Sequence, residues 1–192
     1  LIVGGEPNSI FLEIFFKTLK LKKIKSPMIL ISSEKILKKQ MKKFNFKKKI
    51  FSIELNSLKK NKVYDHKINI INVDFKKSIY DKKNSIMINH YIKKCFEIAF
   101  KLIKKGYSNK IINGPINKKQ YLNKKYPGMT EYISNKFTKK EVGMLIYNKK
   151  LSVCPATTHL PIRSVSKNIT KKLIGDKIEI DTRTSEYKSR VK

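Results

Sequence analysis

Short apolar segments that alternate with longer amphipathic ones most constrain what this chain can fold into. The first, Leu1-Ile2-Val3, ends at Gly4-Gly5 and precedes turn residues and a strongly apolar helical segment, residues 10–19. Further strands are expected at residues 28–32, 49–53 and 68–73, and further helices at residues 35–44 and 86–105. Such alternation is typical of α/β proteins, in which a mostly parallel sheet is flanked by helices.

Two of these helical segments have clear inward faces. Ser33 can cap the first, whose apolar stripe is Ile36, Leu37 and Met41. The second has the strongest helical pattern in the sequence, and Gly106 ends it. Its apolar face consists of Ile92, Cys95, Phe96, Ala99, Phe100, Leu102 and Ile103. We therefore expect Cys95 to be a core residue.

The formal net charge of +31 raises the possibility of nucleic-acid binding, because basic surfaces bind phosphates. The basic residues are almost all lysines, however, and arginine, which binds bases and phosphates in bidentate fashion, occurs only at Arg163, Arg183 and Arg190. The lysines are also spread along the chain, as an A/T-rich coding sequence would produce. We therefore expect no nucleic-acid partner, although the positive field would attract a phosphorylated substrate.

The sequence favours a cytoplasmic protein without a membrane partner. Cys95 and Cys154 have no metal-binding or redox spacing, which fits a reducing compartment. Apolar runs are too short to span a membrane, and no signal-peptide pattern is present. The chain begins at Leu1 inside an apolar run, which suggests that its first residues are missing.

The stretch of residues 110–131 is the most informative part of the sequence. It contains two turns, Asn113-Gly114-Pro115 and Tyr126-Pro127-Gly128, and glycine in such turns permits close backbone approach. Polar side chains that could hold an anionic, hydroxylated ligand lie between and after the turns: Asn117, Lys118, Thr130 and Glu131. An ordinary strand–turn–helix with solvated polar residues would also explain the pattern.

A second informative stretch follows a predicted hairpin, whose strands occupy residues 142–147 and 151–154. We expect this antiparallel pair to extend the otherwise parallel sheet. His159 comes directly after it, where an imidazole could bind a divalent metal, act as a general acid or base, or simply cap a turn. His66 and His90 are interpreted as surface histidines.

Four motifs together resemble the 4-hydroxythreonine-4-phosphate dehydrogenase family of vitamin B6 biosynthesis. Their order and spacing match over about residues 1–173. The motifs are the opening residues 5–13, Gly114-Pro115-Ile116-Asn117-Lys118, Pro127-Gly128-Met129-Thr130-Glu131 and Thr157-Thr158-His159-Leu160-Pro161. The opening segment corresponds to a glycine-rich GDPAGIGPE segment of the family.

The resemblance implies an isocitrate/isopropylmalate dehydrogenase-like fold and a homodimer with its active site near the subunit interface. It implies NAD-dependent oxidation of the phosphorylated small molecule 4-phosphohydroxy-L-threonine, with a divalent metal of the Zn, Mg or Co class, followed by decarboxylation. By the same resemblance, His159 is the first of three metal-binding histidines. Thr130 is a substrate-binding residue, with Met129 beside it in the substrate site.

The chain also departs from the family pattern. Met129 replaces a histidine and cannot donate a hydrogen bond to substrate. In the opening segment, bulkier or longer residues replace the family's Asp, two glycines and proline: Glu6, Ser9, Phe11 and Leu12. The family continues into a second half that carries the other two metal histidines and most phosphate and NAD contacts.

We accordingly divide the chain into a partial dehydrogenase-like region, residues 1–175, and a polar tail of uncertain origin, residues 176–192. Three functions remain open: a divergent dehydrogenase of this family, a dehydrogenase for another phosphorylated hydroxy acid, and a catalytically inactive fragment or binding module of the same fold.

Overall fold

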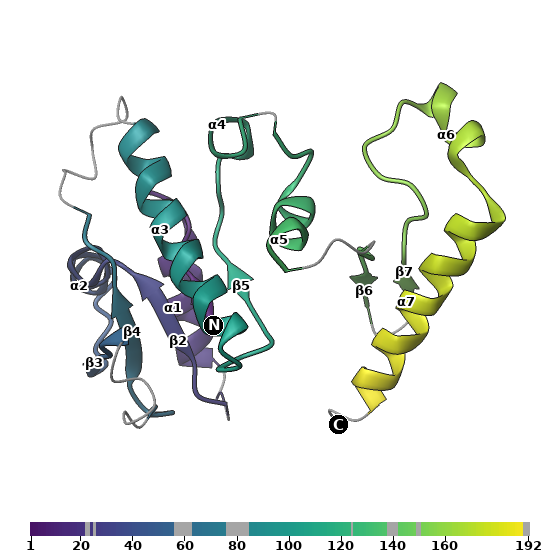
Figure 1. Cartoon of the computed structure of the whole chain (residues 1–192). Coiled ribbons are helices and arrows are strands. Elements are labelled where there is room, and N and C mark those ends of the chain that lie inside the picture. The colour runs from purple at the N-terminus through teal and green to yellow at the C-terminus, as the bar shows by residue number, and fades with distance from the viewer. Residues whose placement is uncertain are drawn as a thin grey trace. The chain divides into compact units, whose positions relative to one another are not determined.

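The protein is described by a computed structural model that covers residues 1–21, 24, 26–55, 63–75, 85–123, 125–137, 142–148 and 151–189. The chain divides into two compact units, Leu1–Tyr121 and Leu122–Lys192, which we call unit 1 and unit 2. Figure 1 shows the helices and strands of both.

Unit 1 contains a sheet of five parallel strands among its described residues. Their spatial order is β3-β4-β2-β1-β5. The strands are β1 (Ile2–Val3), β2 (Ile29–Ser32), β3 (Ile50–Ser52), β4 (Ile68–Asn72) and β5 (Ile112–Asn113). In the centre, Ile2 of β1 lies opposite Leu30 of β2 and Ile112 of β5. The α/β fold with a mostly parallel sheet is thus confirmed.

Helices cover both faces of this sheet. They are α1 (Phe11–Leu21), α2 (Glu34–Lys43), α3 (Ser85–Lys104) and the short α4 (Lys118–Tyr121). The connections through α1 and α2 lead toward β3, whereas the connection through α3 leads back toward β5. Because crossovers between parallel strands are right-handed, opposite directions place the helices on opposite faces. Figure 1 accordingly shows α3 in front of the strands and α1 behind them, and α3 contacts β1 and β2.

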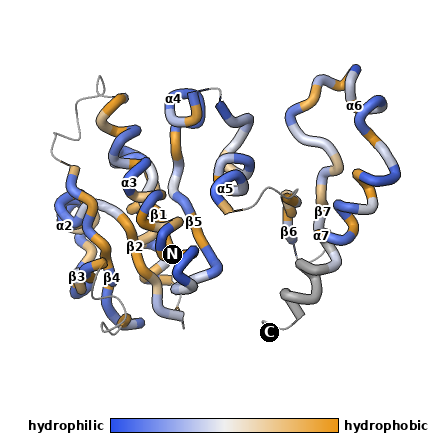
Figure 2. Tube along the Cα trace, in the orientation of Figure 1, coloured by the Kyte–Doolittle hydropathy of each residue, from blue (hydrophilic) through white to orange (hydrophobic). Residues whose placement is uncertain are grey.

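The core of unit 1 lies on both faces of β2 and β4, with α3 packed on one face of the sheet and α1 and α2 on the other. Leu30, Ile31, Ile70 and Ile71 are buried on the two strands. The expected apolar face of α3 is confirmed, since six of its seven residues are buried: Ile92, Cys95, Phe96, Ala99, Phe100 and Leu102. Figure 2 shows the hydrophobic colouring of these strands and of one side of α3.

The predicted cap of α2 is also confirmed. Ser33 has an extended backbone, and its side-chain oxygen accepts a hydrogen bond from the Ile36 N–H at 3.5 Å. This satisfies one of the free donors at the start of the helix. Ile36 and Leu37 are buried as expected, and Met41 is half-buried.

Unit 2 has less regular structure. It contains α5 (Met129–Phe137), β6 (Ile146–Tyr147), β7 (Ser152–Val153), α6 (Ile162–Asn168) and α7 (Lys171–Ser189). Strands β6 and β7 form the predicted antiparallel hairpin, but in the described residues they form a two-stranded sheet of their own. The expectation that this pair extends the parallel sheet is therefore wrong.

Helix α7 is continuous across residue 175, where the sequence suggested a division of the chain. The division into a dehydrogenase-like region and a polar tail of uncertain origin, residues 176–192, stays a prediction. Among the described residues, no helix has both the length and the apolar character that crossing a membrane requires.

The two cysteines differ in accessibility, which gives a first testable prediction. Burial raises the pKa of the Cys95 thiol to about 12, so this group stays protonated near neutral pH, whereas Cys154 is only half-buried. Because the thiolate is the reactive form, we expect a chromogenic disulfide reagent to modify Cys154 in the native protein and Cys95 only after unfolding. A Cys154→Ser variant should then show no rapid reaction, and rapid modification of both thiols in the folded wild type would contradict the burial of Cys95.

Candidate functional site

The opening glycines and the Gly114-Pro115 turn lie against each other at the carboxyl ends of β1 and β5. The Gly114 N–H donates to the Val3 carbonyl at 2.8 Å, and the Glu6 N–H donates to the Pro115 carbonyl at 3.0 Å. A Cβ atom on Gly114 would lie 2.5 Å from the Gly4 carbonyl oxygen. The expected close backbone approach at this turn is therefore confirmed, and two motifs 110 residues apart meet at the edge where α/β sheets bind ligands.

A carboxylate joins the same two motifs. Glu6 Oε1 accepts a hydrogen bond from the Asn117 N–H at 2.6 Å. Asn117 in turn accepts a bond from the Gln120 N–H through its Oδ1 atom at 3.2 Å, which caps the start of α4. Asn117 and Lys118 are exposed, so both side chains are accessible to a ligand. Their role as ligand contacts stays a prediction.

Phe11 occupies space that the family pattern reserves for a glycine. Its Cγ atom would lie 2.9 Å from a Cβ atom on Gly114, and its ring stacks on Phe15 with 6.2 Å between centroids. The side chain therefore packs directly beside the turn. Any ligand that approaches the Gly114 backbone in this chain would meet an aromatic ring as well as peptide groups.

In unit 2, His159 lies next to the turn that precedes α5. Its imidazole Nε2 atom would be 3.5 Å from a Cβ atom on Gly128, and Glu131 Oε2 would be 2.7 Å from the same atom. Met129 and Thr130 follow Gly128 directly, on the first turn of α5, and both are half-buried. The structure thus brings His159 to the segment that contains the two predicted substrate residues.

His159 has a left-handed backbone, with φ of +59°, an uncommon conformation for a residue other than glycine. Residues held in such conformations cluster at ligand sites. The side chain is exposed, so the imidazole is open to solvent. By contrast, His66 and His90 are exposed residues of unit 1, and their interpretation as surface histidines is confirmed.

Glu131 carries an unsatisfied polar atom. Its Oε2 oxygen is buried and has no hydrogen-bond partner among the described residues. Burying an acceptor without a partner costs free energy, and a cation or a ligand N–H or O–H group at this position would supply the missing interaction. From the sequence, Glu131 was only one of several polar residues that could hold a ligand. Its buried oxygen could not be predicted, because the burial depends on how the Gly128 turn packs.

The residues present fit only part of a metal site. Among the described residues, no group of three or more His, Cys, Asp or Glu side chains could hold a metal ion. Catalytic zinc sites use three protein ligands. His159 supplies an imidazole, and Glu131 supplies a carboxylate oxygen beside the same glycine. The assignment of His159 as a metal ligand stays a prediction.

The chain is thus a parallel α/β protein with two glycine turns at the carboxyl edge of its sheet, the edge at which such sheets ordinarily bind ligands. A family model described as "Pyridoxal phosphate biosynthetic protein PdxA" matches residues 23–192. The chain therefore belongs to this family.

Two relatives that match most of this chain are both named 4-hydroxythreonine-4-phosphate dehydrogenase. A 4-hydroxythreonine-4-phosphate dehydrogenase of Sulfurihydrogenibium sp. is 29% identical over 186 residues, covering 95% of this chain and 56% of the relative. That of Aquifex aeolicus is 29% identical over 188 residues, covering 93% of this chain and 55% of the relative. The chain thus spans somewhat more than half the length of these relatives.

Solved structures support the same fold. A 4-hydroxythreonine-4-phosphate dehydrogenase from Burkholderia phymatum superposes with a TM-score of 0.76 at 21% identity, over 93% of this chain and 55% of the other. The enzyme of that name from Klebsiella pneumoniae gives a TM-score of 0.74 at 20% identity, over 95% of this chain and 56% of the other. At these identities the likeness concerns the fold.

The contact between the two glycine motifs yields a stability prediction with a matched control. Gly5 and Gly106 both have positive φ, at 68° and 77°. A Cβ atom at Gly5 would lie 2.5 Å from the Pro115 carbonyl oxygen, whereas one at Gly106 would meet nothing within 4 Å. We expect Gly106→Ala to lower the free energy of unfolding by about 1 kcal/mol, and Gly5→Ala by about 3 kcal/mol because of the added backbone clash.

Chemical denaturation of the two variants and the wild type would measure the difference. Equal losses of stability in both variants would show that the two motifs are not in contact.

Proposed function

We propose that the chain forms part of an NAD-dependent 4-hydroxythreonine-4-phosphate dehydrogenase that oxidises 4-phosphohydroxy-L-threonine in vitamin B6 biosynthesis. The proposal is supported by family membership over residues 23–192. The observation that carries it at the level of the site is the position of His159 Nε2 beside Gly128, directly before Met129 and Thr130.

The reaction needs a hydride acceptor and stabilisation of charge on oxygen. The substrate alcohol loses a hydride to NAD and a proton to solvent or a base, which leaves a ketone β to the carboxylate. Loss of CO₂ then breaks the bond between that carboxyl group and the adjacent carbon. A divalent metal, when bound, would polarise the hydroxyl and later the ketone oxygen.

Residues of this chain would supply part of the metal and substrate contacts. The exposed imidazole of His159 is available as a metal ligand. The nearby Glu131 oxygen, which none of the described residues satisfies, is suited to a cation or a substrate ammonium group. The Thr130 hydroxyl would exchange hydrogen bonds with the substrate. Further metal ligands would come from the second half of the family sequence, beyond the part of the relatives that this chain matches.

The substrate class is supported by charge as well. A net charge of +31 produces a positive field that would draw in a phosphorylated anion. By the family resemblance we further propose a cytoplasmic homodimer, in which the active site is completed near the subunit interface.

Met129 favours a second candidate, oxidation of a different phosphorylated hydroxy acid. It is half-buried at the start of α5, where the family pattern has a histidine. A thioether accommodates apolar groups and cannot donate a hydrogen bond. A substrate with a less polar group at this position would therefore be preferred. A third candidate, a catalytically inactive fragment or binding module, is an outcome of the test below.

The test is a spectrophotometric assay of NADH formation with 4-phosphohydroxy-L-threonine, NAD and a divalent metal. We expect His159→Ala to lower kcat/KM by more than about a hundredfold, because a first ligand of the metal is lost. His90→Ala is the matched control, since it removes an exposed histidine of α3, and should leave the rate unchanged. We expect Met129→His to raise kcat/KM for this substrate by about tenfold, the value of one regained hydrogen bond.

Other results of this assay would favour one of the other two candidate functions. Faster turnover of another phosphorylated hydroxy acid, together with a loss of that activity in Met129→His, would favour the second candidate. If the folded chain forms no NADH with any of these substrates even when the second half of the family sequence is supplied, the dehydrogenase proposal would be contradicted and the binding module supported.

A further inference from the structure

Unit 1 contains a cavity at the edge of the sheet opposite to the glycine turns. Its volume is about 360 Å³, and it is lined by the C-terminal half of α1 and by residues at the starts of β2 and β4. We call it the amino-edge cavity. Its size lies within the range of small-molecule sites. Because α/β sheets ordinarily bind ligands at the carboxyl ends of their strands, the proposed dehydrogenase function does not account for this cavity.

One side of the amino-edge cavity is apolar. Phe15 and Leu30 line it and are buried, and Leu19 and Met28 line it and are half-buried. Replacing water at an apolar cavity wall by an apolar group of a ligand lowers the free energy of the complex. This side therefore suits the apolar body of a ligand, with room for a single ring.

The other side carries an excess of positive charge. Lys20, Lys48 and Lys67 line the cavity, and none of the three forms an ion pair with another described residue. Asp65 also lines it, but its Oδ1 atom lies 3.1 Å from His66 Nδ1. Because three lysines outnumber this one carboxylate, this side suits an anionic group.

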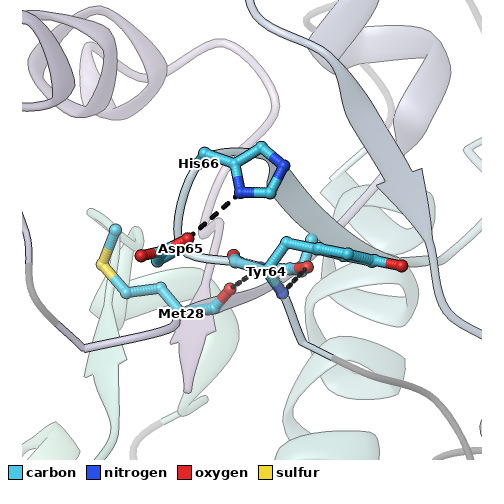
Figure 3. Close-up of polar contacts among 5 residues, drawn as sticks. Met28, Tyr64, Asp65 and His66 are labelled. Atoms are coloured by element: carbon cyan, nitrogen blue, oxygen red, sulfur yellow. Dashed lines mark hydrogen bonds and ion pairs between the residues drawn. The ribbon is translucent and has the colours of Figure 1, made fainter.

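The wall between these sides is held in place by a buried polar residue. Asn69 is 1% exposed, and its Nδ2 group donates to the carbonyls of Met28 at 3.0 Å and Tyr64 at 2.6 Å. Its Oδ1 atom accepts from the Tyr64 N–H at 2.9 Å. Lys67 Nζ lies 3.8 Å from the centre of the Tyr64 ring. Figure 3 shows Met28 and Tyr64, whose carbonyls accept the Asn69 hydrogen bonds, and Asp65 with His66. The Asn69 hydrogen bonds join the residue before β2 to the segment before β4.

We propose that the amino-edge cavity is a second ligand site, which binds a small aryl phosphate. The ring would lie against Phe15 and Leu30, and the phosphate would be bound by Lys48 and Lys67. Preorganisation of the wall by Asn69 would lower the entropic cost of binding. This site shares no residue with the set proposed for dehydrogenation, which belongs to unit 2.

The chain offers a matched pair of lysines for the test. Lys48 lines the cavity and is half-buried, whereas its neighbour Lys49 is exposed and is not among the lining residues. Lys48→Met and Lys49→Met remove the same charge from a chain whose net charge of +31 attracts any anion. Calorimetric titration with phenyl phosphate should show binding weakened about tenfold in Lys48→Met and by less than about twofold in Lys49→Met.

Two further measurements complete the test. Inorganic phosphate should bind about tenfold more weakly than phenyl phosphate, because it lacks the ring. Backbone amide NMR signals of residues 64–69 should shift on addition of phenyl phosphate. The proposal would be overturned by equal weakening in both lysine variants, by equal affinity for inorganic phosphate, by amide shifts confined to Gly4 and Gly114, or by the absence of saturable binding.

Discussion

The close contact between Gly4-Gly5 and Gly114-Pro115 is the constraint on which the architecture of unit 1 depends. Strand β1 has only two residues, yet it joins β2 on one side to β5 on the other. Hydrogen bonds just beyond its ends extend this pairing: Gly4 N–H to the Ile31 carbonyl at 3.1 Å and Ile112 N–H to the Leu1 carbonyl at 2.9 Å. A side chain at Gly5 or Gly114 would clash with the backbone of the other motif and would disturb the neighbouring Glu6–Asn117 contact at the start of α4.

The sequence predicted most elements of unit 1 because local signals and tertiary packing agree there. Ser33 caps α2, and the stripe on α3 faces the core, since both follow from residue types at helical spacing. For helix α1, the sequence did not predict which side of the helix is buried. Ile10 and Ile14 share a helical stripe with Phe11 and Phe15, yet they are 58% and 50% exposed. The buried residues are Leu12, Phe15 and Phe16, because the position of the sheet selects the buried side of a largely apolar helix.

The sequence pointed to the residue types of the candidate site, but it predicted only part of how these residues are arranged in space. The motifs identified Thr130 and His159, and the structure places His159 Nε2 near Gly128, beside the start of α5. The left-handed backbone of His159 and the buried Glu131 oxygen depend on how the two loops meet, which no local pattern encodes. The hairpin shows the same limit, since alternation predicted β6 and β7 correctly but not which sheet they join.

The high positive charge cannot by itself specify where this protein binds ligands. Lysines occur on all of the described helices, so an anion is attracted to much of the surface, and a site needs an additional feature that holds the ligand in one place. The two proposed sites differ in this feature. In unit 2, the Glu131 oxygen, which has no hydrogen-bond partner in the part of the chain that the structure describes, favours a cation or a donor group. In unit 1, lysines that form no ion pair with another described residue lie in the same cavity as Phe15 and Leu30, and they favour an anion with an apolar body. The opposite chemistry of the two sites implies that they would bind different ligands and could be occupied independently.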